Sequence, residues 1–359
     1  MNKLNASFYD IYKSYDDNYK KLPLKLRRYR KVNTKNNKKF TFLGFPINIP
    51  FGIPAGPLLN SKYIKAAFDL GFDVSTYKTV RSIEFPCHPH PNIVYVKSPK
   101  NLYPDKTKRL TQDDSKKNLY PLAITNSFGV PSKKPSVWQN DVKKALKYQK
   151  NGQLLILSLM GTVKENQSQN DFINDYVKTA LKAKKTGAKA IEINLSCPNI
   201  GNEGLVCYNL DLTEKICKKV KEVLKKTPLI IKVGFYKNPK DIKKLAEIAN
   251  KYVDAIAAIN TLQSEVVNKN GDQALPGKNR LRSGVCGSCI KWAGVDMVKK
   301  LADIRKKNNY KYEIIGVGGV MNVKDFRDYL NAGADLVQSA TGAMWNTQLA
   351  EEISNSLLN

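Results

Sequence analysis

The residues of this chain that could do chemistry follow short apolar runs. Cys197 lies in the stretch INLSCPN, directly after the run Ala190–Leu195, and Pro198 restricts the backbone that follows it. A thiol with an ordinary pKa near ~8.5 can accept a proton when a loop closes over it. A single cysteine is more commonly a small buried hydrophobe. Residue type and spacing alone leave these two interpretations of Cys197 balanced.

Two lysines and four asparagines occupy similar places after apolar runs. Lys78 and Lys232 end runs that we expect to be buried, where an ammonium must face an anion or a carbonyl group. Amide side chains both donate and accept hydrogen bonds, so several of them around one site suit a planar ring with alternating C=O and N–H groups. Each amide alone would be a turn residue, but together they indicate a small polar ligand; they are Asn126, Asn194, Asn199 and Asn260.

Small residues follow the last two apolar runs, as GVGG at 316–319 and SATG at 339–342. Backbone N–H groups without bulky side chains can approach a phosphate closely, and the last two strand loops of α/β barrels frequently bind one. Glycine pairs are also common in ordinary turns. Because two such loops occur at the matching pair of runs, we predict a phosphate-binding site.

Cysteine and histidine residues form two further clusters that could suggest a metal site. Cys286 and Cys289 form a C-x-x-C motif, and Cys87, His88 and His90 lie close together in the sequence. Zinc sites of this kind usually need a second cysteine or histidine pair at a fixed spacing, and Cys286 lies in the glycine-rich stretch SGVCGS. A redox-active dithiol would need a thioredoxin-like context, which is missing. We predict no bound metal ion.

The composition limits the class of protein. The 359 residues carry a formal net charge of +29, from 60 Lys+Arg and 31 Asp+Glu. Such a charge can indicate a nucleic-acid or anionic-membrane partner. The basic residues are spread along the whole chain, however, and no aromatic–basic nucleic-acid motif occurs. We therefore favour a lysine-coated surface without a nucleic-acid partner, which would still attract small anionic substrates.

The cysteine content and the apolar segments predict where the protein is found. Hydrophobic residues make up 42% of the chain, enough for a globular core, and six cysteines are too few for a disulfide scaffold of this length. The N-terminus has no apolar signal-peptide region, and the charge-free stretch 40–61 contains four prolines that would interrupt a spanning helix. We expect a cytoplasmic protein that does not span a membrane.

Eight apolar runs alternate with helical patterns, which predicts a closed parallel barrel, a (β/α)8 TIM barrel. A doubly wound open sheet is the alternative, but no G-x-G-x-x-G motif follows the first run. Active sites of such barrels lie at the carboxyl ends of the strands, where the residues named above would meet. The runs are Phe51–Ala55, Val74–Lys78, Leu154–Leu159, Ala190–Leu195, Leu229–Val233, Ala255–Asn260, Glu313–Val317 and Leu336–Ser339.

Two segments lie outside the alternating pattern. Residues 1–39 are polar and rich in Lys and Tyr, so we interpret them as an N-terminal extension with a helix over Phe8–Lys20. Residues 79–135 are rich in Pro, Lys and Tyr and contain two short apolar runs. Long structured insertions in compact domains are often functional. We expect this excursion to form a few antiparallel strands as a lid over the barrel mouth, within a single domain of residues 40–359.

The order of these stretches resembles the dihydroorotate dehydrogenases, especially their soluble class 1 branch. The resemblance extends from about residue 45 to the C-terminus, and INLSCPN combined with NSFGVP is its most specific part. The matching stretches are IPAG at 53–56, YKT at 77–79, TNSFGVPS at 125–132, INLSCPN at 193–199, IKVG at 231–234, INT at 259–261, GVCGS at 284–288, IIGVGG at 314–319 and VQSATG at 337–342.

The resemblance implies an FMN-dependent flavoprotein that oxidises dihydroorotate to orotate in de novo pyrimidine synthesis. In such enzymes a base removes the C5 proton, and a hydride passes from C6 to N5 of the flavin. The base position is Cys197 here, whereas the membrane-associated class 2 enzymes have a serine, so the cysteine indicates class 1. Class 1 relatives also imply a homodimer.

The resemblance assigns roles to the remaining residues by position. Backbone amides near Phe128–Val130 would meet the substrate carboxylate, and Lys232 would face the N1/C2 carbonyl region and stabilise the anionic reduced flavin. The implied substrate-binding residues are Lys78, Asn126, Phe128, Gly129, Val130, Asn194, Asn199, Asn260 and Thr261. The implied FMN-binding residues are Ala55, Gly56, Lys78, Thr79, Asn194, Lys232, Gly287, Gly318, Gly319, Ala340 and Thr341.

The chain departs from the family pattern in three places and leaves two alternatives open. The excursion is long, Cys286 replaces a usually small residue, and the extension at 1–39 is not typical. The segment 260–288 also resembles the pyrimidine-reducing domain of dihydropyrimidine dehydrogenase, which would act on uracil or thymine. Asn199 favours dihydroorotate, because that other family usually has CPH where this chain has CPN. A basic nucleic-acid-binding flavoprotein is the second alternative.

The electron acceptor has no signature in the sequence. No dinucleotide-binding fingerprint follows a predicted strand, and no cysteine spacing typical of iron–sulfur clusters occurs. We therefore expect that this chain alone does not use NAD. Fumarate, a quinone and a partner reductase all remain open as acceptors.

Overall fold

A computed structural model of the chain describes residues 6–23, 26, 29–32, 40–107, 109–115, 120–196 and 206–358. Its central element is an eight-stranded closed barrel in which every neighbouring pair is parallel, which confirms the predicted TIM barrel. Each strand lies where the apolar runs predicted one. The barrel strands are β3 (Phe51–Ile53), β4 (Val74–Val80), β8 (Leu154–Leu159), β9 (Ala190–Asn194), β10 (Leu229–Val233), β11 (Ala255–Ala258), β14 (Glu313–Val317) and β15 (Leu336–Gln338).

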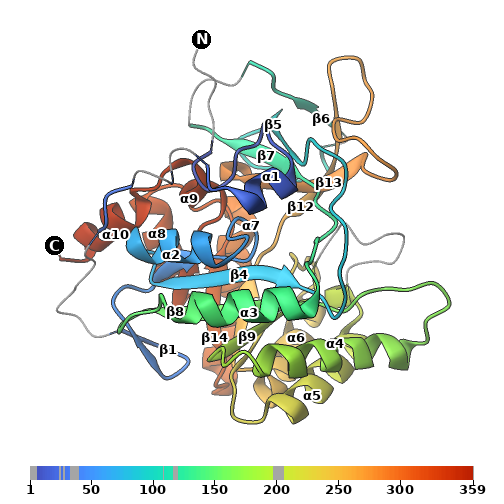
Figure 1. Cartoon of the computed structure of the whole chain (residues 1–359). Coiled ribbons are helices and arrows are strands. Elements are labelled where there is room, and N and C mark those ends of the chain that lie inside the picture. The colour runs from blue at the N-terminus through green and yellow to red at the C-terminus, as the bar shows by residue number, and fades with distance from the viewer. Residues whose placement is uncertain are drawn as a thin grey trace.

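Helices cover the outside of the barrel (Figure 1). On α5, Ile216, Val220 and Leu224 are fully buried at a four-residue spacing, so one apolar stripe faces the strands. Asn238 caps α6 by accepting from Lys240 N at 3.0 Å, and Pro239 follows at the first helical position. The outer helices are α2 (Ser61–Asp69), α3 (Pro135–Leu146), α4 (Gln169–Lys184), α5 (Leu210–Leu224), α6 (Pro239–Tyr252), α7 (Lys291–Asn308), α8 (Val323–Asn331), α9 (Thr341–Trp345) and α10 (Leu349–Leu358).

A hairpin closes the barrel at the amino ends of its strands. It consists of β1 (Phe40–Phe42) and β2 (Phe45–Ile47), paired antiparallel. Phe42 and Ile47 are buried in one cluster with the inward-facing side chains of the barrel. The charge-free stretch is therefore strand and turn, as its prolines indicated, and its apolar residues fill the lower end of the barrel.

The excursion forms part of a second, smaller barrel. Its five strands are β5 (Ile93–Lys97), β6 (Arg109–Gln112), β7 (Ala123–Asn126), β12 (Leu262–Val267) and β13 (Arg282–Gly287), and the sheet is closed. Figure 1 shows these strands in the upper part of the view, above β4 and β8. Strands in the excursion were expected, but β12 and β13 come from a segment for which the sequence predicted no strands.

The described part of the N-terminal extension packs against the barrel. The predicted helix over Phe8–Lys20 is wrong in its first half, because α1 spans only Tyr15–Lys20 and is capped by Ser14, whose side chain accepts from Asp17 N. Ahead of the helix, Phe8 is fully buried and contacts Phe72 edge to face at 6.0 Å. A segment of polar composition therefore inserts aromatic side chains into the same core as the barrel helices.

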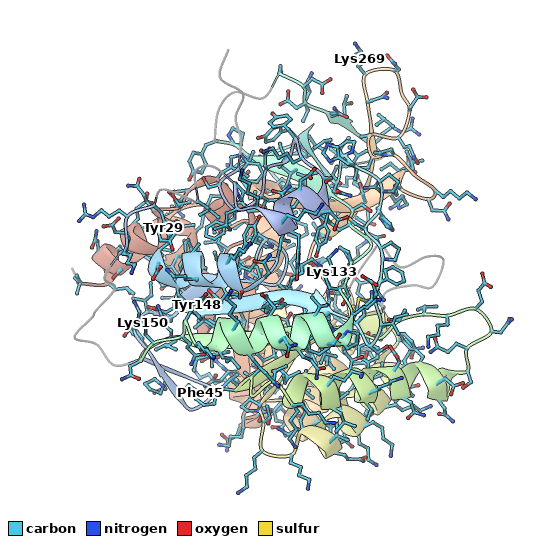
Figure 2. All side chains as sticks on the ribbon, viewed as in Figure 1. Tyr29, Phe45, Lys133, Tyr148, Lys150 and Lys269 are labelled. Atoms are coloured by element: carbon cyan, nitrogen blue, oxygen red, sulfur yellow. The ribbon has the colours of Figure 1, made fainter. Side chains whose placement is uncertain are left out.

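Lysines dominate the surface, and none of the helices in the described ranges is long and apolar enough to cross a membrane. Lys150 and Lys269, labelled in Figure 2, are exposed. Several lysines pair with carboxylates at the surface, as Lys133 does with Asp16 at 2.9 Å. Exposed pairs of this kind contribute little to stability, typically ~0–1 kcal/mol.

Candidate active site

A cleft opens at the carboxyl ends of the barrel strands, beneath the smaller barrel. Its empty space is about 1150 Å³, including the part open to solvent. It brings together most of the residues that the sequence predicted, from segments that lie between β3 and α9 in the chain. These are Ala55, Gly56, Lys78, Thr79, Asn126, Phe128, Val130, Asn194, Lys232, Asn260, Thr261, Gly318, Gly319, Ala340 and Thr341.

Two of the predicted residues that the structure describes do not line the cleft. Gly129 lies in the chain between two lining residues, and Gly287 supports one of the glycine loops from behind. Cys197 and Asn199 fall outside the described residues. Their predicted roles therefore remain predictions.

Lys232 places its amino group on the inside of the barrel, where it lines the cleft. It is opposite Asn194 in the parallel pairing of β9 and β10, so both side chains point into the barrel. Burial lowers the pKa of Lys232, and the Glu192 carboxylate counteracts this shift. Burial also raises the pKa of Glu192, which the Lys232 ammonium opposes. Lys232 is thus the one charged residue of β10, and together with Asn194 it places polar side chains at the bottom of the cleft.

The segment that leads to Cys197 is held by amide groups. Asn260 donates from Nδ2 to the carbonyl oxygen of Ser196 at 2.7 Å. Ser196 in turn donates from its backbone nitrogen to Asn194 Oδ1 at 3.1 Å. Tyr176 donates from its hydroxyl to the Asn194 carbonyl oxygen at 3.2 Å. Two of the predicted ring-binding amides thus also fix the backbone immediately before the predicted base.

On the opposite wall, Cys286 connects the excursion to the last barrel loop. Asn126 donates from Nδ2 to Gly284 O at 3.3 Å and to Cys286 Sγ at 3.6 Å. Thr341 donates from its hydroxyl to the same sulfur at 3.5 Å. Burial raises the pKa of the Cys286 thiol, so it stays protonated near neutral pH.

The glycine loop after β14, where we predicted a phosphate site, has a conformation that requires glycine. Gly318 and Gly319 have φ angles of +126° and +69°, which favour glycine. A Cβ atom on Gly319 would lie 2.8 Å from both the Gly287 carbonyl oxygen and the Lys291 backbone nitrogen. The loop can therefore hold its conformation, with its backbone open to a ligand, only without a side chain at this position.

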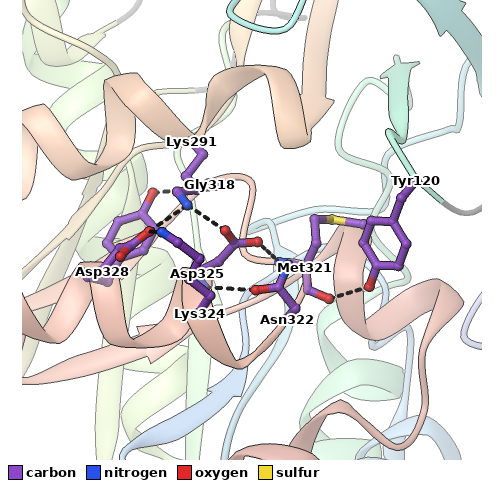
Figure 3. A network of polar contacts seen from close by, with 9 residues as sticks. Tyr120, Lys291, Gly318, Met321, Asn322, Lys324, Asp325 and Asp328 are labelled. Atoms are coloured by element: carbon purple, nitrogen blue, oxygen red, sulfur yellow. Dashed lines mark hydrogen bonds and ion pairs between the residues drawn. The ribbon is translucent and has the colours of Figure 1, made fainter.

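A network of polar contacts braces the same loop from outside (Figure 3). Tyr329 donates to the Gly318 carbonyl oxygen at 2.6 Å. Asp325 accepts from Met321 N at 2.9 Å and also pairs with Lys291. Together these contacts fix the loop on α7 and α8, so its backbone is organised before any ligand binds.

The excursion contacts this loop as well. Tyr120 donates from its hydroxyl to the Met321 carbonyl oxygen at 2.6 Å, as Figure 3 shows. A residue of the predicted lid is thereby hydrogen-bonded to the predicted phosphate loop, which lies 201 positions further along the chain.

Tyr9 is a lining residue that sequence reasoning missed. It comes from the N-terminal extension, is 2% exposed, and its ring meets Phe128 edge to face at 5.4 Å. Tyr15 also contacts the Phe128 ring, at 6.3 Å. A tyrosine in a polar segment gives no sequence signal of this kind. The buried Glu192, by contrast, could have been found as a charge within the strand pattern IEIN.

The clusters considered as metal sites do not assemble into one. Within the ranges that the structure describes, no group of three or more His, Cys, Asp or Glu side chains could hold a metal ion. Cys286 and Cys289 are free thiols, as are Cys87, Cys207 and Cys217.

Comparisons with known proteins agree with this geometry. The family model described as "Dihydroorotate dehydrogenase" matches residues 114–359. A dihydroorotate dehydrogenase of Dictyostelium discoideum is 40% identical over 374 aligned positions, which cover 99% of both chains. The catalytic subunit of dihydroorotate dehydrogenase B (NAD(+)) of Brachyspira hyodysenteriae is 28% identical and covers 67% of this chain and 73% of its own. The corresponding subunit of Thermoplasma volcanium is 36% identical over 46% of this chain and 52% of its own.

Proposed function

Because this chain belongs to the dihydroorotate dehydrogenase family, we propose that it oxidises dihydroorotate to orotate with FMN as its cofactor, in pyrimidine biosynthesis. One observation carries the proposal: a single cleft unites two buried lysines, three amides and two loops of small residues. The lysines suit an anionic ring system, the amides suit a pyrimidine, and the loops suit a phosphate.

The residues of the cleft fit FMN. The cradle at Gly318 and Gly319, which a Cβ atom would fill, would hold the phosphate together with Ala340 and Thr341. Lys232 would hold the ring system from below, where its cation favours added negative charge. When bound, FMN supplies the acceptor for the hydride that leaves C6 of the substrate. Further FMN contacts that we assign are Ala55, Gly56, Lys78, Thr79, Asn194 and Gly287.

The chain itself would supply the base and the orientation of the substrate. The Cys197 thiolate would take the proton from C5 of dihydroorotate. Its placement would depend on the preceding backbone, which Asn260 and Asn194 hold through Ser196. A single hydrogen-bonded unit would then orient both the pyrimidine ring and the base.

The substrate carboxylate would be bound at the other side of the cleft. Backbone N–H groups of Phe128, Gly129 and Val130 would receive it, while Lys78 would lie beside the ring. The ring edge would be held by the amides and a hydroxyl, Asn126, Asn194, Asn199, Asn260 and Thr261. Thr261 Oγ1 is buried without a hydrogen-bond partner among the described residues, as expected of a group that a ligand satisfies.

Family membership favours dihydroorotate over the two alternatives, a uracil- or thymine-directed dihydropyrimidine dehydrogenase and a nucleic-acid-binding flavoprotein. We further propose that residues 40–359 form the FMN-binding domain, with residues 79–135 as its lid and residues 1–39 as an N-terminal extension. We also propose that the chain is cytoplasmic and forms a homodimer. The class 1 resemblance of the sequence supports the dimer. Light scattering of the purified protein would test it directly.

The decisive experiment follows flavin absorbance under anaerobic conditions. Dihydroorotate should bleach the flavin of the wild type, and Cys197→Ala should slow this step by ~10²–10⁴-fold, the usual contribution of a general base. Cys217→Ala is the matched control, because Cys217 is a fully buried thiol on α5, remote from the cleft. A flavin that dihydrouracil reduces and dihydroorotate does not would refute the proposal. Once dihydroorotate has reduced the flavin of the wild type, reoxidation by fumarate, a quinone or a reductase would identify the acceptor.

A further inference from the structure

Side chains and backbone groups outside the loop Ser127–Val130 bind all four of its carbonyl groups. Arg280 donates from Nη2 to the Ser127 carbonyl oxygen at 2.6 Å, and His88 N donates to that of Phe128 at 3.1 Å. The remaining two carbonyl oxygens, of Gly129 and Val130, both accept from Arg81.

Arg81 holds this part of the loop with two donors of one guanidinium. Its Nη2 lies 3.0 Å from the Gly129 oxygen, and its Nε lies 2.9 Å from the Val130 oxygen. The side chain is 1% exposed, although no motif in the sequence singles it out. A planar guanidinium that bonds two successive carbonyls restrains both peptide planes at once.

Further contacts fix the guanidinium itself. Arg81 Nη1 donates to the Gly161 carbonyl oxygen at 3.2 Å, and its guanidinium carbon lies 4.1 Å from the centre of the Phe85 ring. Its backbone is tied as well, because Trp138 donates from Nε1 to the Arg81 carbonyl oxygen at 3.2 Å. The restraint on the loop thus comes from a side chain that cannot easily move.

The orientation of the carbonyls determines that of the amides. In a trans peptide the C=O and the following N–H point in opposite directions. When the carbonyl oxygens of Ser127, Phe128 and Gly129 are bound from behind, the N–H groups of Phe128, Gly129 and Val130 point away from those partners. These three N–H groups donate to no acceptor within the part of the chain that the structure describes.

The backbone at this point is strained. Gly129 has φ = +73° and Val130 has φ = +53°, and a β-branched residue rarely adopts such a conformation. Successive N–H groups in a turn of this kind converge on one point and form an anion-binding concavity. Strain persists only where the surroundings enforce it, and the bonds from Arg81 to Gly129 and Val130 do so.

We propose that Arg81 is a positioning residue for the substrate carboxylate. Its bond to the Gly129 carbonyl keeps the Val130 N–H turned toward the cleft, its bond to the Val130 carbonyl anchors the end of the loop before Pro131, and its buried cation adds an attractive potential for the anion. The proposal rests on the proposed function above, because it needs a substrate with a carboxylate. His88, beside the loop, does not replace this charge, since burial and the nearby Arg280 and Arg81 lower its pKa.

The test compares two ligands that differ only in the charge at this position. Orotate and its methyl ester are titrated into flavin-loaded protein, and the change in flavin absorbance gives the dissociation constant of each. In Arg81→Gln, orotate affinity should fall by about 10-fold, or ~1.4 kcal/mol, while that of the ester changes little. Arg81→Lys keeps the charge but cannot hold both carbonyls, so it should recover only part of the loss.

Arg305→Gln is the matched control. Arg305 also holds two carbonyls, those of Tyr312 at 3.1 Å and Gly333 at 3.2 Å, but at the opposite end of the barrel. It should lower thermal stability without changing the ratio of the two dissociation constants. An unchanged ratio in Arg81→Gln, or an equal loss for both ligands, would overturn the inference. Failure of dihydroorotate to reduce the wild-type flavin would instead refute the proposed function, independently of Arg81.

Discussion

Gly129 lies in the loop Ser127–Val130, to which we assign the substrate carboxylate, and Gly129→Ala should disturb both folding and binding. Its φ of +73° would cost alanine ~1–2 kcal/mol. A Cβ atom would lie 2.5 Å from His88 Nε2 and 2.7 Å from His88 Cδ2, far inside contact distance. The imidazole would have to move, although its Nδ1 is 3.1 Å from Ser127 Oγ. Loss of that bond adds ~0.5–1.5 kcal/mol, and an off-rotamer ring adds a similar amount.

Gly44→Ala separates the two contributions. Gly44 has φ = +77° and lies in the hairpin at the other end of the barrel, where a Cβ atom would meet nothing within 4 Å. It should therefore cost only the backbone strain of ~1–2 kcal/mol. Gly129→Ala should cost ~1–3 kcal/mol more, from the displaced His88 ring.

Urea unfolding of the two variants gives these free energies, and titration with orotate gives the affinity. Orotate binding should weaken about 10-fold or more in Gly129→Ala, because the loop amides move with the displaced ring, a change of ~1.4 kcal/mol or more. It should be unchanged in Gly44→Ala. If the two variants lose equal stability and bind orotate equally well, the assignment of this loop is wrong.

Three other substitutions test separate parts of the site. Gly319→Ala should abolish stable FMN binding, measured as the flavin-to-protein ratio after dialysis; full retention of flavin would contradict the phosphate assignment. Tyr9→Ala should remove the contact with Phe128 and cost ~3–5 kcal/mol, the range for large buried aromatic side chains. It should also raise KM for dihydroorotate more than it lowers flavin content, and an unchanged KM would exclude Tyr9 from the site. Hydrogen bonds from Lys291 and Lys324 lower the pKa of Asp328. The difference in unfolding free energy between wild type and Asp328→Asn should therefore be fully present at neutral pH. It should shrink below about pH 4, as the pH falls through the lowered pKa. A difference that stays constant down to pH 2 would rule out this ion pair.

The barrel could be predicted because each of its strands is buried on both faces. Such strands form continuous apolar runs, as in LLILSL at 154–159, and the helices between them bury one stripe. Strands β12 and β13 of the smaller barrel were not predicted. In β12 the side chains of Gln263 and Glu265 alternate with buried neighbours, and one of its two partner strands, β6, lies 156 positions away in the sequence. Local periodicity cannot reveal pairing of that kind.

The cleft was predictable for a related reason, since the carboxyl ends of parallel strands must meet at one edge. The residues around it were harder to find. Arg81 acts through carbonyl groups that lie 48 and 49 positions away, and backbone acceptors leave no trace in side-chain identity. Tyr9 comes from a polar segment in which nothing indicated a residue of the cleft. Contacts of this kind depend on tertiary packing and become visible only in the folded chain.

The hairpin of β1 and β2 closes one end of the barrel. Phe42 and Ile47 fill the end opposite the cleft, and the Leu43 backbone nitrogen donates to Glu313 Oε2 at 2.7 Å at the rim. Among the described residues, Tyr9 and Phe128 line the cleft at the opposite end of the barrel, and we expect substrate and product to pass there. For a small acceptor such as fumarate that enters by the same opening, we expect the pyrimidine product to leave first, and initial-rate plots at several acceptor concentrations should then give parallel lines.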